Sequence, residues 1–137
     1  MNPVWYFVLS SLIAVIGIVY IINSTIEKVY ENFEDKIKLQ RNMFLKIAAM
    51  EIIPLALIVL GFVQIDNYHG KLTNNYPLFI ILGTLTFGIV TLIEKYFSIG
   101  QISSEKKNHL LTLLFIGIML VSSFPIIGIV VTQILAT

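Results

Sequence analysis

Four long apolar segments, separated by polar links, make up most of the chain. They run over about residues 4–22, 43–63, 76–93 and 110–135. Each is close to, or longer than, the roughly 20 residues that cross a bilayer as an α-helix. Because a helix satisfies its own backbone hydrogen bonds in lipid, the pattern predicts an all-α membrane protein with four transmembrane helices.

The three polar links differ in kind. The first, residues 24–41, is charged and has few helix breakers, so we expect two helix ends that meet in a short polar turn near Asn32. The second, residues 66–75, and the third, residues 98–108, each contain a glycine and are predicted to be loops. Ser104, or Ser103, is a suitable cap for the start of the last helix.

The composition narrows the class of protein. The chain of 137 residues is 57% hydrophobic and only 12% charged, whereas soluble domains average about 25% charged residues. The net charge of +1 gives no case for a nucleic-acid partner. The absence of cysteine and the presence of only two, isolated histidines give no case for a metal site, and we expect no cofactor.

Basic residues predict the orientation in the membrane. They gather in and beside the first and third links, and only Lys71 lies in the second. By the positive-inside rule, the first and third links are expected to be cytoplasmic, and both termini and the second link extracytoplasmic. The amino end lacks the basic region of a signal peptide, so we interpret the first segment as a retained span.

The second half of the chain repeats the first at a constant offset of 71 residues, with no gap. The matches include an acid, a phenylalanine, glycines and prolines, which are rarer coincidences than apolar matches. They pair Gly17-Ile18-Val19 with Gly88-Ile89-Val90, Glu34 with Glu105, Phe44 with Phe115, Ile47 with Ile118 and Pro54 with Pro125. The chain is therefore predicted to be a tandem duplication: a first hairpin over residues 1–66, a link over 67–75 and a second hairpin over 76–137.

A carboxylate lies in the middle of the second apolar segment. Glu51 is 13 residues beyond Lys38 and 13 before Gln64, roughly 20 Å from either polar end of a helix. A charge at that depth costs about 2.5–3.5 kcal/mol or more, so an intramembrane acid is a candidate functional residue. In the second copy the equivalent residues are Ser122 and, for Pro54, Pro125. A serine can bond to its own helix backbone, so we expect the second copy to be silent in proton chemistry.

Residues 25–54 resemble the c subunit, or proteolipid, of rotary ATP synthases and ATPases. The similarity lies at the end of the first helix, in the polar loop, at the start of the second helix and at the ion-binding carboxylate with its following proline. The corresponding residues are Thr25-Ile26-Glu27, Asn32-Phe33-Glu34, Met43-Phe44, Glu51 and Pro54. In the second copy, Phe115-Ile116-Gly117 and Pro125-Ile126-Ile127-Gly128 are similar to the family. A double hairpin with one acid resembles the V-type form, in which the acid usually lies in the second hairpin rather than the first.

The resemblance implies a rotor in a bacterial cell membrane. Many copies would stand in a ring, and each Glu51 would take up H⁺ or Na⁺ from one half-channel and release it at another. A stator membrane subunit would supply an arginine, and stalk subunits would bind the cytoplasmic loops near Asn32 and Glu105. The chain has no nucleotide-binding motif, so any ATP chemistry would belong to another subunit.

The residues around the acid favour H⁺ over Na⁺. Family members that bind Na⁺ resemble this chain at Glu51 but supply a glutamine on the first helix and a serine or threonine directly after the acid. The matching positions here are Ile18 and Ile52, which cannot ligate a cation.

Other interpretations of the sequence remain open. One is a divergent c-like membrane anchor, or ring, of another complex without ion transport. Another is a small four-helix proton-coupled transporter. Glu51 can also be structural, paired with a polar group across the bundle, and Lys46 can either extend to the cytoplasmic surface or pair with Glu94.

Overall fold

The computed structural model describes residues 2–68, 75–99 and 103–136, except for the side chain of Ala136. Within these residues all regular secondary structure is helical and there is no strand. The elements are α1 (Val4–Glu31), the short 3₁₀ turn η1 (Phe33–Asp35), α2 (Lys36–Met50), α3 (Ile52–Asp66), α4 (Tyr76–Phe97) and α5 (Ser104–Ala136). Together, η1, α2 and α3 form one span, and the four spans are long and apolar enough to cross a membrane. The prediction of an all-α protein with four spans is therefore confirmed.

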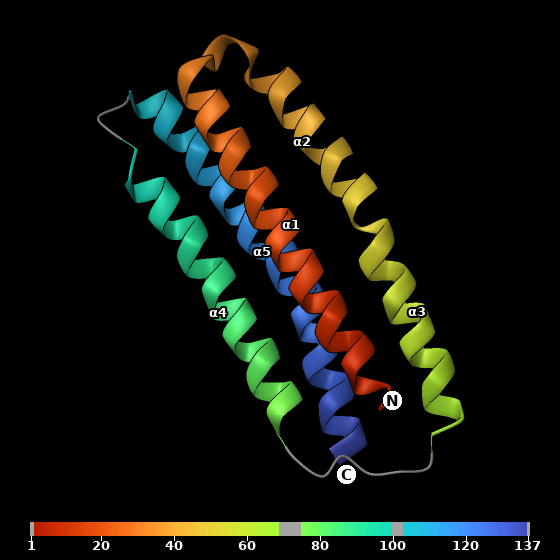
Figure 1. The fold of residues 1–137 in the computed structure, drawn as a ribbon. Coiled ribbons are helices and arrows are strands. Elements are labelled where there is room, and N and C mark those ends of the chain that lie inside the picture. The colour runs from red at the N-terminus through yellow and green to blue at the C-terminus, as the bar shows by residue number, and fades with distance from the viewer. Residues whose placement is uncertain (1, 69–74, 100–102, 137) are drawn as a thin grey trace.

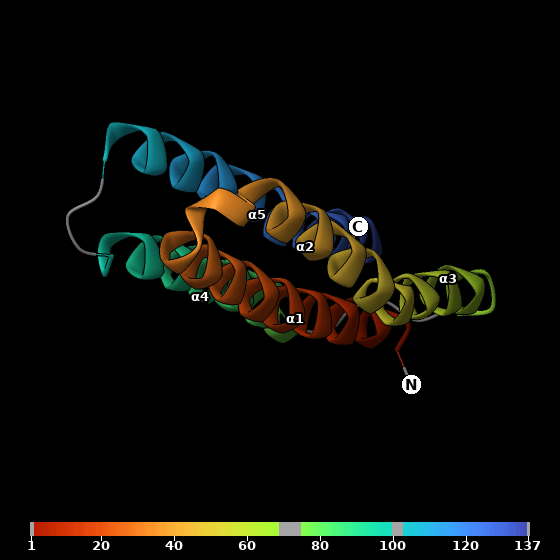
Figure 2. The ribbon, with the colours of Figure 1, turned by 90° about the horizontal axis from the view of Figure 1, so that it is seen from above.

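Helix α1 is the centre of the bundle. It packs against α5, α4, α3 and α2, while α4 packs against α5. Seen from above, α1 and α4 form one layer, and α5 and the α2–α3 span form the other (Figure 2). The first and third links lie at one end of the bundle, and both termini lie at the other (Figure 1). The first helices of the two predicted hairpins thus lie side by side.

The helix ends depart from the apolar segments where charged residues continue a helix. Helix α1 continues beyond the apolar segment to Glu31, and the polar turn near Asn32 follows it, both as predicted for the first link. Residues 104–108, predicted as loop, are the first turn of α5. Ser103 Oγ accepts the N–H of Lys106 at 3.4 Å, and the acidic Glu105 in the first turn suits the positive end of the helix dipole.

Two glycines at equivalent places in the two hairpins bring helices into close contact. A Cβ atom at Gly17 would lie 2.6 Å from Met50 Sδ, and one at Gly88 would lie 2.9 Å from Val121 Cγ1. Gly17 and Gly88 are 71 positions apart, and so are Met50 and Val121. The same glycine contact therefore joins the first and second helices of each hairpin, at the offset of the sequence repeat.

Candidate functional site

Glu51 occupies the one-residue interruption between α2 and α3. Pro54 leaves one helical hydrogen bond unmade here, because proline has no N–H to donate to the carbonyl of Met50 four residues earlier. The backbone on either side stays helical: Glu51 N–H donates to the Ile47 carbonyl at 2.9 Å, and the Glu51 carbonyl accepts Leu55 N–H at 3.0 Å. The span continues through the break to the opposite end of the bundle (Figure 1).

The break lies near the middle of the span. The span runs over Phe33–Asp66, so Glu51 is 18 residues from one end and 15 from the other. At 1.5 Å per residue these separations are roughly 27 and 23 Å. No other Asp, Glu, Lys or Arg lies between Lys46 and Asp66, or within residues 4–26, 77–93 and 110–137. The chain thus carries one ionisable acid at mid-depth.

Small side chains fix the break against α1. Ser10, which is 1% exposed, donates its hydroxyl to the Pro54 carbonyl at 3.0 Å. Gly17 makes room for Met50, and Gly61 makes room for Phe7 farther along the same interface. Glu51 is therefore held at a defined height beside α1. Sequence reasoning did not assign Ser10 a role in the site, although its small size was the available signal.

The Glu51 side chain is half-buried and makes no hydrogen bond or ion pair with the described residues. The positions around it on the chain face outward: Ile52 is 66% exposed, Ile53 59% and Leu55 51%. Among the described residues, Glu51 therefore does not pair with a polar group across the bundle. Glu51 lies at the border between the contact with α1 and an open apolar face.

The two isoleucines predicted beside the ion site lie in different surroundings. Ile18 on α1 is fully buried in the core of the bundle, whereas Ile52 on α3 faces outward. Neither brings an oxygen atom toward Glu51. Lys46 is exposed and forms no ion pair with Glu94; the described ion pairs are Lys36–Glu105 and Lys95–Glu27.

The equivalent position in the second hairpin has different chemistry. Helix α5 continues without interruption through Pro125. Ser122 Oγ donates to the Ile118 carbonyl at 2.7 Å, which is the bond to its own helix that the sequence predicted for it. Ser122 and Pro125 therefore reproduce the place of Glu51 and Pro54 without a titratable group.

The two links predicted to bind stalk subunits contact each other. Lys36 Nζ lies 3.4 Å from Glu105 Oε1 and 4.3 Å from the centre of the Phe33 ring. Lys106 Nζ donates to the Tyr30 carbonyl at 3.4 Å. Asn32 lies in the turn between α1 and η1, as predicted. Glu105 lies in the first turn of α5 and not in a loop, because α5 begins at Ser104.

Comparison with family models, curated proteins and solved structures finds no significant match. The function must therefore be inferred from the residues and geometry described above.

Proposed function

We propose that the chain is a proteolipid-like rotor-ring subunit that translocates H⁺ by reversible protonation of Glu51. One observation carries the proposal: the single acid at mid-depth lies at a proline break, half-buried, with no partner among the described residues. A structural acid would be expected to have a partner, because an unpaired polar group in lipid costs free energy. An acid that exchanges its proton with a second subunit needs to be accessible.

The physical chemistry of the site suits two alternating states. Facing lipid, the Glu51 carboxyl stays neutral, because an apolar medium disfavours the charged form. Beside the arginine of a stator subunit, the anion is favoured and the proton leaves toward water. The proton is taken up again when Glu51 leaves the arginine. Proton release therefore needs the positive charge of a partner subunit, while this chain supplies the carboxyl group.

The exposed faces leave room for neighbouring copies. The α2–α3 span packs mainly on α1, and its outer face carries large exposed apolar side chains. They include Leu45, Ile52, Ile53, Leu55, Val59, Leu60, Phe62 and Val63. Lipid or the next copy in a ring can cover this face. The side-by-side α1 and α4 are consistent with an inner layer of such a ring (Figure 2).

The surroundings of Glu51 favour H⁺ as the ion. A Na⁺ site would need several oxygen ligands near the carboxylate, and Ile18 and Ile52 supply none. The cytoplasmic links near Asn32 and Glu105 are the proposed stalk contacts, and the proposed location is a bacterial cell membrane with both termini extracytoplasmic.

The test is labelling of the purified chain with dicyclohexylcarbodiimide, an apolar reagent that reacts with protonated carboxyl groups. We expect modification of Glu51 in peptide mapping, and its loss in Glu51→Gln. Glu94, which is exposed near the polar end of α4, is the matched carboxyl and should stay unmodified. If Glu51 is not labelled at any of the pH values tested, the result contradicts the proposal.

A second measurement separates the proposal from a non-transporting anchor. Native mass spectrometry of the assembly gives the number of copies, and proton release from the same assembly is compared for the wild type and Glu51→Gln. A ring whose function tolerates Glu51→Gln would favour the anchor. A single copy that moves protons would favour a small transporter.

A further inference from the structure

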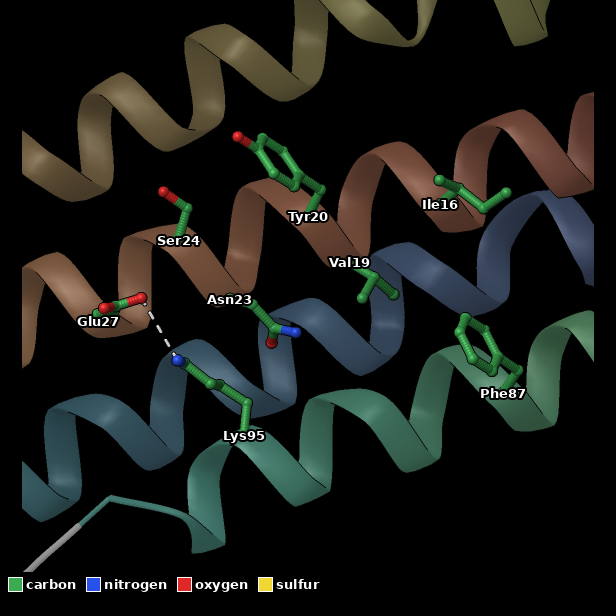
Figure 3. Close-up of a pocket in the computed structure, with 8 residues that line it drawn as sticks. All are labelled: Ile16, Val19, Tyr20, Asn23, Ser24, Glu27, Phe87 and Lys95. Atoms are coloured by element: carbon green, nitrogen blue, oxygen red, sulfur yellow. Dashed lines mark hydrogen bonds and ion pairs between the residues drawn. The ribbon is translucent and has the colours of Figure 1, made fainter.

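A groove opens between α1 and α4, away from Glu51. It has a volume of about 470 Å³ and is lined by Ile16, Val19, Tyr20, Asn23, Ser24, Glu27, Phe87 and Lys95 (Figure 3). This volume is within the roughly 300–1,000 Å³ of pockets that bind small molecules. The groove therefore has the size of a ligand site.

The lining residues change character along the groove. Ile16, Val19 and Phe87 lie toward the middle of the bundle, and Asn23, Glu27 and Lys95 lie toward the end that carries the first and third links (Figure 3). Ile16 is 11 residues before Glu27, roughly 16 Å along α1. A matching ligand has an apolar tail in the membrane and a polar head at the surface, which describes a lipid.

The charges at the mouth favour a headgroup with both signs. Lys95 Nζ and Glu27 Oε2 are 3.4 Å apart, so a cation and an anion of the ligand would each find an opposite charge. A smaller adjoining pocket of about 260 Å³ adds Glu94 next to Lys95. A purely anionic headgroup would be attracted by Lys95 but repelled by both acids.

The charge of the headgroup separates the candidate lipids. A primary ammonium carries a positive charge and N–H donors for the exposed Glu27 carboxylate, whereas a glycerol headgroup carries hydroxyls but no positive charge.

We infer that this groove binds a zwitterionic phospholipid with a primary amine, such as phosphatidylethanolamine. Its phosphate lies near Lys95, its ammonium near Glu27, and one acyl chain runs along Ile16, Val19 and Phe87. This inference is independent of the proposed role of Glu51.

The experiment is native mass spectrometry of the full chain, purified from an equimolar mixture of phosphatidylethanolamine and phosphatidylglycerol. The wild type should retain the ethanolamine lipid about two- to fivefold over the glycerol lipid, the factor that one partly exposed ion pair contributes. Glu27→Gln should abolish or reverse the preference, and Lys95→Gln should lower the retention of both lipids.

The chain offers a matched control in its other ion pair. Lys36–Glu105 has the same 3.4 Å distance and the same 30% lysine exposure, but lies outside the groove. Lys36→Gln should therefore leave the lipid preference unchanged. Equal ratios for Glu27→Gln and Lys36→Gln, or retained lipid that mirrors the mixture, would overturn the inference.

A competition experiment distinguishes binding of the whole lipid from binding of its headgroup alone. Water-soluble phosphoethanolamine at the same concentration should not displace the bound lipid, because it cannot fill the apolar half of the groove. Displacement by the free headgroup would overturn the assignment of the acyl chain to Ile16, Val19 and Phe87.

Discussion

The two hairpins share a sequence register but differ in their second helices. In the first, the helix is interrupted at Glu51 and divided into α2 and α3; in the second, α5 runs unbroken through Pro125. Both prolines lack the N–H that would bond four residues back. Proline alone therefore does not determine whether the helix breaks.

Packing explains the difference. Helix α5 contacts both α1 and α4, whereas the α2–α3 span packs mainly on α1. In the most apolar window of each span, 39% of the α5 positions are buried, against 22% for the span that carries Glu51. Membrane helices tolerate proline where neighbouring helices and Ser or Thr side chains compensate for the missing bond. The acid therefore lies on the less supported of the two helices.

The largest expected effect comes from placing the acid in the other hairpin. Ser122→Glu should lower the free energy of unfolding by about 3 kcal/mol, the cost of an acid at the centre of a membrane helix. Glu51→Ser should raise it, by less, because it removes that cost from a half-buried position. Steric trapping in detergent micelles measures both changes. Equal tolerance of a glutamate at 51 and at 122 would show that packing does not distinguish the hairpins.

The equivalent glycines should respond differently to the same substitution. A Cβ atom in Gly88→Ala meets Val15 Cγ1 at 2.7 Å and Val121 Cγ1 at 2.9 Å, and valine is stiff at χ1. We expect a loss of about 1–3 kcal/mol in the free energy of unfolding, as in other overpacked cores.

Gly17→Ala is the matched variant in the first hairpin. Its new methyl group meets the sulfur end of Met50, which is flexible and can move. The gain in helix propensity from Gly to Ala offsets the remaining contact, so the change should be within about 1 kcal/mol of zero. The same unfolding measurement compares the two, and an equal loss in both would contradict the role assigned to side-chain stiffness.

Adjacent serines on α1 provide a smaller effect. Ser10 bonds across the helix interface to the Pro54 carbonyl, whereas Ser11 bonds to the Phe7 carbonyl of its own helix. Ser10→Ala should cost about 0.6 kcal/mol, the average for hydrogen bonds between membrane helices, and Ser11→Ala less. Amide hydrogen exchange around Pro54 should increase only in Ser10→Ala. Increased exchange there in Ser11→Ala as well would contradict this.

Hydropathy was enough to locate the four spans, because a span needs only length and apolar composition. The turn near Asn32 also followed from local polarity. The interruption at Glu51 did not, because Pro125 occupies the same position in α5 and causes none. Nor did the groove beside Asn23 and Lys95, since it depends on how α1 and α4 lie together, which neither segment specifies alone.

An effect similar in size to that of Ser10→Ala separates the two ion pairs that join the hairpins. Lys36–Glu105 and Lys95–Glu27 have the same 3.4 Å distance, and such partly exposed pairs contribute about 0.2–1 kcal/mol. Lys36 Nζ also lies over the Phe33 ring at 4.3 Å, a cation–π contact worth about 0.5–1 kcal/mol at an exposed site. Lys36→Ala should therefore destabilise the chain more than Lys95→Ala when no lipid is bound. The difference should vanish in a Phe33→Leu background, and high salt should weaken both pairs. If the difference persists without the ring, the extra stability must come from the Lys36–Glu105 ion pair itself.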